Sequence, residues 1–314
     1  MIIFIVVMSV MILFTGCLAV IYYIAFYSNR KHHPAPFEMP RGSQYEPYTK
    51  QLVDSVRRLD EVPYEPVYIT SYDGLKLFGR WYDAGKGAPV AILFHGYRST
   101  ALRDSSGGAP FCMEQGFSVL LIDQRAHGKS EGRTITFGIK ERRDCLSWIE
   151  YIIKRVGNDA RIMLMGVSMG AATVMMAADL ELPNNVICIA ADCGYSSPEA
   201  IILTVAGRMA IPVCIARPLA RIAAHVIGRF DLNETSAVEA VKKLKIPLYI
   251  IHGDDDRMVP FNMSKEIHNA NPEMTHLTEI KDAGHGIAYY VDMEKYKSVA
   301  AEVCSITAGK EFKA

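Results

Sequence analysis

The segment G-V-S-M-G at positions 166–170 constrains this chain more than any other part of the sequence. It follows the apolar run 161–165, which is typical of a buried strand, and it precedes 171–178, which is rich in good helix formers. A strand that feeds a helix through G-x-S-x-G holds the serine on a sharp turn, with its hydroxyl clear of the sheet. The residues two before and two after the serine crowd together there, so glycine is required at both. By itself the segment also fits a helix that Ser168 merely caps.

Short apolar runs alternate with helix-like stretches along most of the chain. A hairpin is predicted at 67–82, with its turn at Asp73-Gly74. Further strands are expected at 90–94, 117–122, 161–165, 186–191, 247–251 and 277–280. Continuous apolar strands with helical crossovers predict the α/β class, with a mostly parallel central sheet covered by helices on both faces.

Three of the expected helices lie at 48–59, 107–115 and 137–156. The last is strongly amphipathic. We expect its polar face to carry Lys140, Arg142, Arg143 and Lys154.

The first 27 residues carry no charged side chain and are almost wholly apolar. About 20 such residues suffice to span a bilayer, so residues 1–27 are predicted to be a single transmembrane anchor. A cleaved secretory signal and a lipoprotein signal ending at Cys17 are the alternatives. Both fit less well, because no Lys or Arg precedes the apolar stretch and it continues well beyond Cys17. Arg30 and Lys31, beside His32 and His33, follow the span and predict that the rest of the chain lies on the cytoplasmic side.

The overall composition argues against several kinds of partner. Lys plus Arg and Asp plus Glu both number 34, so the formal charge is zero and no basic face for nucleic acid is indicated. The seven cysteines show no C-x-x-C pair and no zinc-ligand spacing. We expect them to be reduced and mostly buried thiols, which fits a cytoplasmic location. No metal and no cofactor is predicted.

The sequence divides into three parts. Residues 1–27 form the predicted anchor, and residues 28–63 form a tether with a short helix. The prolines between His33 and Pro47 predict a stiff, irregular tether that does not pack. Residues 64–314 form the globular domain, whose strand–helix rhythm is interrupted at about 195–244.

Two further polar segments follow late strands. Three adjacent carboxylates occupy 254–256, and His285 stands between two glycines at 284–286. Alone, the carboxylates fit a solvated turn and the histidine fits an exposed loop tip. In chain order, however, a serine, an acid and a histidine follow three different strands, which is characteristic of one hydrolase fold. The carboxyl ends of parallel strands share one edge of a sheet, so these side chains are expected to meet.

The sequence resembles the α/β-hydrolase superfamily, and in particular its esterase-like members that carry an N-terminal membrane anchor. Five segments over about 64–306 carry the resemblance: F-H-G-Y at 94–97, D-Q-R-A-H-G-K-S at 123–130, G-V-S-M-G at 166–170, H-G-D-D-D-R-M-V-P at 252–260 and G-H-G at 284–286. The second departs from the family's D-x-R-G-x-G-x-S at Ala126 and His127. The resemblance implies an α/β-hydrolase fold in which the insertion at about 195–244 is a helical cap, with helices near 200–211 and 218–227 broken by Pro212 and Pro218.

The resemblance also suggests roles for the site residues. Ser168 is the expected nucleophile, and His285 is the expected general base and acid. Asp256 is the expected orienting acid, because the family's acid is the third residue after the glycine of H-G-x-x-D. The oxyanion hole is expected from the backbone N–H groups of Met169, directly after the nucleophile, and of Tyr97.

Other histidines near these segments are expected to have structural roles. His95 and His252 should be structural hydrogen bonders, and His127 lies in a turn where the sequence identifies no partner.

The expected function is that of a membrane-anchored serine hydrolase that cleaves carboxylic esters through an acyl-enzyme. The expected substrate is an ester or thioester with an apolar, lipid-derived acyl group. One wall of the acyl pocket could come from apolar cap residues, although packing of the cap onto the sheet explains most of them better: Ile201, Ile202, Leu203, Val205, Met209, Ile211, Val213 and Ile215.

Other functions remain open at this point. A serine peptidase or amidase, a thioesterase and an acyltransferase would use the same three residues. A non-catalytic, membrane-tethered binding protein with a hydrolase fold is an alternative from a different class.

Overall fold

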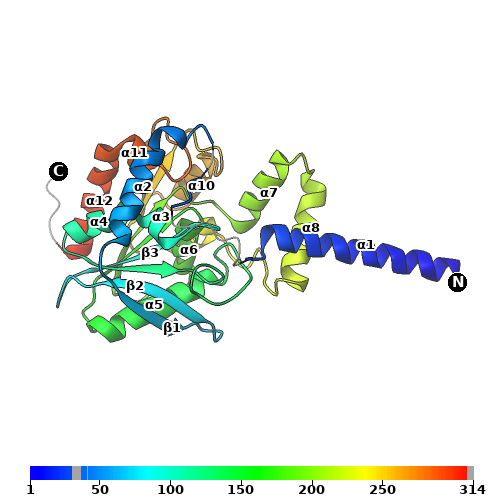
Figure 1. Cartoon of the computed structure of the whole chain (residues 1–314), viewed down its shortest axis with the longest axis horizontal. Coiled ribbons are helices and arrows are strands. Elements are labelled where there is room, and N and C mark those ends of the chain that lie inside the picture. The colour runs from blue at the N-terminus through cyan, green and yellow to red at the C-terminus, as the bar shows by residue number, and fades with distance from the viewer. Residues whose placement is uncertain (30–36, 41, 310–314) are drawn as a thin grey trace.

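A single eight-stranded sheet forms the centre of the protein, as seen in a computed structural model that describes residues 1–29, 37–40 and 42–309 (Figure 1). The strand order is β1-β2-β4-β3-β5-β6-β7-β8. Strands β3 to β8 run parallel, while β2 is antiparallel to both of its neighbours. The strands are β1 Glu65–Thr70, β2 Lys76–Tyr82, β3 Val90–Phe94, β4 Ser118–Asp123, β5 Ile162–Val167, β6 Val186–Asp192, β7 Leu248–Gly253 and β8 Thr275–Ile280. The predicted α/β class with a mostly parallel sheet is confirmed.

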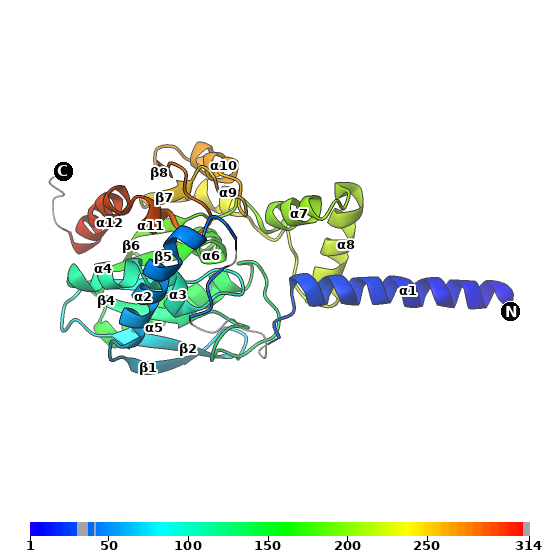
Figure 2. The same cartoon turned by 45° about the horizontal axis from the view of Figure 1, so that its top comes forward.

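Helices cover both faces of the sheet (Figures 1 and 2). One face packs against α5 Glu141–Val156, α6 Met169–Ala177, α9 Ala237–Val241 and α10 Asn262–Ala270. The other packs against α2 Thr49–Asp60, α3 Ala101–Ser105, α4 Gly108–Glu114 and α12 Met293–Ala308, and the short α11 Ala288–Val291 precedes α12. Alternate residues of β3 enter the two cores: Ile92 faces the first and Leu93 the second. Burial on both faces explains why the inner strands are continuously apolar.

Helix α5 starts four residues later than predicted, at Glu141. Phe137 and Gly138 both have positive φ, at 53° and 94°, which a right-handed helix cannot accommodate. The buried Glu141 carboxylate accepts hydrogen bonds from the N–H groups of Thr136 and Gly138 and so holds this turn. The prediction of Arg142 on the polar face is wrong: it is buried and pairs with Asp179 and Glu234.

Helix α1, Ile2–Ala25, projects from one end of the domain (Figures 1 and 2). It is long and apolar enough to cross a bilayer, a property shared by membrane spans and signal sequences. Its residues are exposed as far as Cys17, whereas Leu18 and Phe26 are buried against the domain. Phe26 packs edge-on against Phe137 and Phe230. The basic flank at 30–33, on which the predicted orientation rests, lies outside the described residues.

Three helices lie between β6 and β7: α7 Pro198–Arg208, α8 Val213–Val226 and the short α9. Helix α8 packs against α1, and α7 packs against α8 (Figure 1). A break is observed at Pro212, as predicted. The predicted break at Pro218 is wrong, because α8 runs through this residue. The small residues Ala220, Ala223 and Ala224 of α8 are buried in the same core as Leu18 of α1, and α1 contacts α8 directly.

Candidate active site

Ser168 lies on a strained turn between β5 and α6, with φ 56° and ψ −115°. The two flanking glycines allow this turn. A Cβ on Gly166 would lie 2.3 Å from the carbonyl carbon of Gly170, and a Cβ on Gly170 would lie 2.0 Å from the carbonyl oxygen of Phe94. No larger side chain fits at either position without movement of the backbone. The Ser168 side chain makes no capping hydrogen bond to α6, so the interpretation of Ser168 as a simple helix cap is wrong.

The structure brings Ser168, His285 and Asp256 together at the carboxyl edge of the sheet. They follow β5, β8 and β7 respectively. The Ser168 Oγ lies 2.9 Å from His285 Nε2, and His285 Nδ1 lies 2.7 Å from Asp256 Oδ2. The hydrogen-bond chain therefore runs from a hydroxyl through an imidazole to a carboxylate.

The neighbouring acids do not contact His285. Asp254 accepts a hydrogen bond from the N–H of Asp282 at 2.6 Å, and the exposed Asp255 pairs with Arg257 at 3.0 Å. Among the three adjacent carboxylates, only Asp256 is hydrogen-bonded to the histidine.

Asp256 is held by four donors. Its Oδ2 accepts from His285 and from His252 Nε2 at 3.0 Å, and its Oδ1 accepts from the N–H groups of Met258 and Val259 at 2.7 and 2.8 Å. Burial alone would raise the pKa of Asp256, but the hydrogen bonds from His252 and His285, and the positive charge of each ring whenever it is protonated, hold it well below its usual range. The carboxylate is therefore ionised at neutral pH.

His252 supports the acid, as its predicted structural role requires. Its Nε2 faces two acceptors, Asp256 and the carbonyl of Val259 at 3.0 Å, so this nitrogen carries the proton. Its Nδ1 then accepts from the Ser264 hydroxyl at 2.6 Å.

The environment of His285 sets its basicity. Burial disfavours the charged ring, but the hydrogen bond and charge of Asp256 outweigh burial and raise the pKa of His285 above 6.5. Nδ1 donates to Asp256, which leaves the lone pair of Nε2 directed at the Ser168 hydroxyl. This arrangement suits proton transfer from the serine.

Two backbone N–H groups are available beside Ser168. Met169 directly follows it, and Gly96, which precedes Tyr97, comes so close that its Cβ would lie 3.2 Å from the Ser168 Cβ. Among the residues that the structure describes, the N–H groups of Tyr97 and Met169 have no hydrogen-bond acceptor. Both are the predicted oxyanion donors.

Buried polar side chains hold the Gly96 loop. Asp104 accepts from the Gly96 N–H at 2.7 Å, and His95 accepts from the N–H of Gln124 at 3.1 Å. The predicted structural role of His95 is confirmed. His127, for which the sequence identified no partner, accepts from the N–H of Arg98 at 3.0 Å.

A cavity of about 190 Å³ lies beside Ser168 and His285. Pro40 and Tyr45 from the predicted tether contribute to its wall. Gln44 donates from its side-chain amide to the backbone carbonyl of Asp255 at 2.7 Å and to its carboxylate at 2.9 Å. The prediction of an unpacked tether is therefore wrong for the described part of 37–48, and the sequence held no local signal for this long-range contact.

A second, mostly apolar cavity extends from the first between the sheet and helices α4 and α12. Asp192, at the end of β6, lines both cavities. Burial raises the pKa of Asp192 to about 6, and its Oδ1 has no hydrogen-bond partner within the described part of the chain. The sequence analysis did not identify this residue, whose only signal was its position at a strand end.

The cap contributes less to these cavities than expected. In the described part of the chain, no residue of α7 or α8 lines either cavity. Five of the eight apolar residues considered for an acyl pocket are instead exposed: Val205, Met209, Ile211, Val213 and Ile215. The expectation of an acyl-pocket wall from these residues is wrong.

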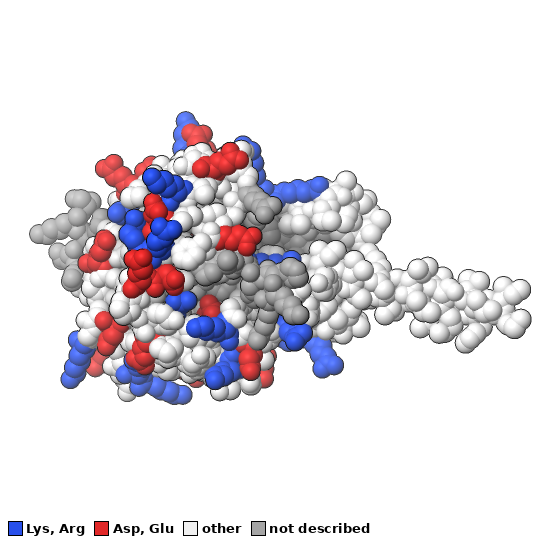
Figure 3. All heavy atoms as spheres, viewed as in Figure 1, with Lys and Arg blue, Asp and Glu red and all other residues white. Residues whose placement is uncertain are grey.

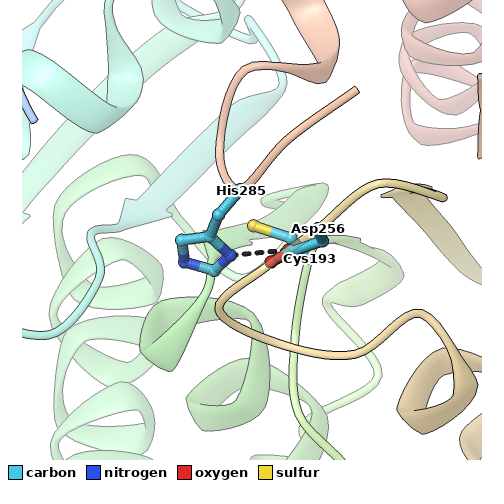
Figure 4. Close-up of side chains that lie close together, drawn as sticks. All are labelled: Cys193, Asp256 and His285. Carbon is cyan, nitrogen blue, oxygen red and sulfur yellow. Dashed lines mark hydrogen bonds and ion pairs between the residues drawn. The ribbon is translucent and has the colours of Figure 1, made fainter. Parts of the chain in front are cut away.

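Cys193 lies beside Asp256 and His285, with the possible ligand atoms of all three within 4.8 Å of one another (Figure 4). This set fits a metal poorly. Burial raises the pKa of the Cys193 thiol well above its usual value, so the thiolate that a metal needs is disfavoured. The Asp256 oxygens are already engaged by four donors. The arrangement is better suited to proton transfer than to metal binding.

Comparisons with known proteins find hydrolases and esterases among the similar sequences and structures. The family described as "Serine aminopeptidase, S33" matches residues 86–234, a region that includes Ser168 and ends before Asp256 and His285. The uncharacterized protein YqkD of Bacillus subtilis (strain 168) is 23% identical over 212 residues, which cover 67% of this chain and 69% of that protein. The bifunctional esterase/perhydrolase DCH of Acinetobacter calcoaceticus is 23% identical over 245 residues, covering 63% of this chain and 84% of that protein.

A solved structure extends the similarity to three dimensions. The esterase Pf2001 of Pyrococcus furiosus superposes with a TM-score of 0.65 at 26% identity, over 79% of this chain and 92% of that chain. The match therefore takes in nearly the whole of the other protein. The chain therefore has the α/β-hydrolase fold, and it is similar to esterase-like hydrolases of that fold.

Proposed function

We propose that this protein is a membrane-anchored serine hydrolase that cleaves carboxylic esters, with Ser168 as nucleophile, His285 as general base and acid, and Asp256 as orienting acid. The observation that carries the proposal is the hydrogen-bond chain with distances of 2.9 and 2.7 Å between these side chains. The strained turn at Ser168 also supports the proposal, because it exposes the hydroxyl to the cavity.

The reaction proceeds in two halves. His285 Nε2 removes the Ser168 proton as Oγ attacks the ester carbonyl, and the N–H groups of Tyr97 and Met169 stabilise the oxyanion. His285 then returns the proton to the leaving alcohol, and the C–O bond breaks to give an acyl-enzyme. In the second half, water loses a proton to His285 and attacks the acyl group. His285 then returns the proton to Ser168 Oγ as the acyl–Oγ bond breaks, which releases the carboxylic acid. Throughout, Asp256 holds the histidine in one tautomer and stabilises its cation.

The substrate class follows from the walls of the site. The second cavity, lined by residues such as Met163, Phe111 and Val303, is mostly apolar and adjoins the first. With a volume of about 40 Å³ it suits a short apolar acyl segment, with the carbonyl left beside Ser168 in the first cavity. We therefore propose an ester whose acyl part is apolar, and the proposed anchor favours a lipid-derived one.

The anchor is proposed to be α1, as a single span with the hydrolase domain on the cytoplasmic side. The length and composition of α1 support a span. The basic residues Arg30 and Lys31 support this orientation. Removal of residues 2–17, the exposed part of α1, tests the anchor: a high-salt or carbonate wash should release the shortened chain from membranes but not the native chain, and retention of the shortened chain would refute α1 as the span.

The proposal is tested with a fluorophosphonate probe and a matched pair of variants. The native chain should be labelled and should hydrolyse short soluble esters, and Ser168→Ala should abolish both. Ser106→Ala is the control, because Ser106 lines the same cavity but is hydrogen-bonded to Tyr290. Labelling that survives in Ser168→Ala, or a native chain that never reacts, would refute a Ser168 nucleophile.

A serine peptidase is the second candidate, favoured by the description of the matching family. A panel of esters, thioesters and aminoacyl amides, run on native and Ser168→Ala protein, separates the two. Esters should be cleaved with the highest kcat/KM. A higher kcat/KM on amides would favour the peptidase.

A further inference from the structure

The end of the cap exposes a continuous apolar surface. Every residue in 207–215, which we term the cap tip, is exposed, and Arg208 is its only charged residue. Met209, Val213 and Ile215 expose 59%, 47% and 50% of their surface. Soluble proteins rarely leave apolar side chains clustered in water, and such clusters mark sites of contact.

The charge of the surrounding cap is net positive. Residues 198–230 contain four arginines, Arg208, Arg217, Arg221 and Arg229, and one acid. That acid, Glu199, pairs with Arg217 and Arg221. Figure 3 agrees, since this end of the molecule is white with a few blue side chains, and red is confined to the body of the domain. An apolar surface with a basic rim complements the anionic face of a bilayer.

The position of the cap along α1 matches the boundary of a bilayer that α1 would span. Helix α1 is about 36 Å long and a bilayer hydrocarbon core is about 30 Å thick. Only residues 2–17, about 24 Å of helix, project free of the domain. When α1 spans the core, the part that packs against α8 therefore lies at the bilayer boundary.

Two further features of the structure also place the bilayer boundary near α8. Tyr22, Tyr23 and Tyr27 lie at the domain end of α1, where aromatic residues favour the membrane interface. Helix α8 runs across α1 in both views, so it lies along the membrane surface when α1 crosses it (Figures 1 and 2).

We infer that the cap tip and the outer face of α8 insert into the headgroup region of an anionic bilayer, as a second membrane contact beside α1. This inference rests on the anchor in the proposed function. The contact holds the carboxyl edge of the sheet, where Ser168 lies, toward the lipid surface. A lipid-phase ester then reaches the cavity without crossing bulk water.

The test uses the native cysteine in the cap tip. Cys214 and Cys17 are exposed, whereas the other five cysteines are buried. In a Cys17→Ser chain, Cys214 is labelled with an environment-sensitive fluorophore and the protein is reconstituted into vesicles of phosphatidylcholine and phosphatidylserine. Acyl-brominated lipids should quench this label, and aqueous iodide should not.

The matched control carries the label elsewhere. Lys86→Cys, made with Cys17→Ser and Cys214→Ser, places it in the exposed loop before β3, at the opposite edge of the sheet. This label should be quenched by iodide only. If Cys214 behaves as this control does, the inference is overturned. If Cys214 is shielded from both quenchers and the shielding depends on protein density, a second copy covers the cap tip and the inference is also overturned.

Activity provides an independent readout. Ile211→Asp with Ile215→Asp should lower hydrolysis of a long-chain ester in vesicles about tenfold, with a short soluble ester hydrolysed at the native rate. Tyr68→Asp, an equally exposed apolar position on β1, should change neither rate. Equal rates on the vesicle ester for native and double variant would overturn the inference. Loss of all ester hydrolysis in the native chain would instead count against the proposed function, because lipid quenching does not require catalysis.

Discussion

At the scale of single residues, the adjacent carboxylates of Asp255 and Asp256 have different contacts. Asp256 accepts from two histidines and two backbone N–H groups, whereas Asp255, next to it, is exposed and pairs with Arg257. Asp256 is buried and the Asp255 side chain is exposed, so two chemically identical groups meet different surroundings. The two carboxylates can therefore be separated experimentally.

Asp256→Asn should lower kcat on a soluble ester by about 10⁴-fold, because an amide leaves the wrong tautomer of His285 facing Ser168. Asp255→Asn is the matched control and should stay within about twofold of the native rate, as a change at an exposed pair does little. Steady-state kinetics on both variants provide the measurement. A large loss in Asp255→Asn with none in Asp256→Asn would identify Asp255 as the acid.

The pH profile of kcat/KM should report the raised pKa of His285. Nε2 must be unprotonated to accept the Ser168 proton, so activity is lost as pH falls through the pKa of the free enzyme. Because Asp256 raises that pKa, the acidic midpoint should lie above 6.5. In Asp256→Asn the residual activity should show a lower midpoint. An unchanged midpoint in that variant would argue against coupling between the two groups.

At the scale of elements, the turn between β5 and α6 is determined by close contact of backbone segments. Gly166 meets the backbone of Gly170, and Gly170 meets the backbone of Phe94 in β3. These contacts join three elements at one point, and none can be relieved by rotation of a side chain.

Gly170→Ala should destabilise the domain by about 3 kcal/mol or more, since a Cβ 2.0 Å from the Phe94 carbonyl oxygen forces α6 away from the end of β3. Gly207→Ala in α7 is the control, because its Cβ meets nothing within 4 Å. Gly207→Ala should leave the stability of the domain unchanged or raise it by about 0.5–1 kcal/mol. Thermal unfolding followed by circular dichroism compares the two, and equal stabilities would contradict the steric argument.

At the scale of the whole molecule, α1 is both a projecting helix and part of the core. Tyr97 donates from its hydroxyl to the carbonyl of Ala25 at 2.9 Å, and Arg98 donates to the carbonyl of Ile24 at 2.8 Å. Two carbonyls that the helix end would leave unpaired are thus satisfied by the loop that carries a proposed oxyanion donor. The proposed anchor and the proposed site are joined by direct hydrogen bonds.

Phe26→Ala should lower the free energy of unfolding by about 3–5 kcal/mol, because it empties a site between Phe137 and Phe230. Phe4→Ala, on the exposed part of the same helix, should leave the domain's stability unchanged. Urea unfolding in detergent provides the comparison. Equal midpoints for Phe26→Ala and native protein would show that the end of α1 is not part of the cooperative unit.

Much of the fold could be predicted from the sequence because its signals are local. The strands were expected within one or two residues of their observed bounds, since apolar runs buried on both faces stand out against polar loops. The start of α5 was missed because positive φ at Phe137 and Gly138 depends on the buried Glu141 that holds the turn. Helix α8 was expected to break at Pro218, yet its packing against α1 outweighs this local signal.

The sequence by itself determined the turn at Ser168 and the order of serine, acid and histidine along a parallel sheet. The close backbone contacts of the turn allow only glycine at 166 and 170, and the carboxyl ends of parallel strands lie at the same edge of the sheet. Only the tertiary structure decided which face of the cap meets solvent, that Gln44 and Tyr45 reach the site, and that Phe26 enters the core. Those outcomes depend on contacts between segments far apart in the chain, and no local pattern of residue types encodes such contacts.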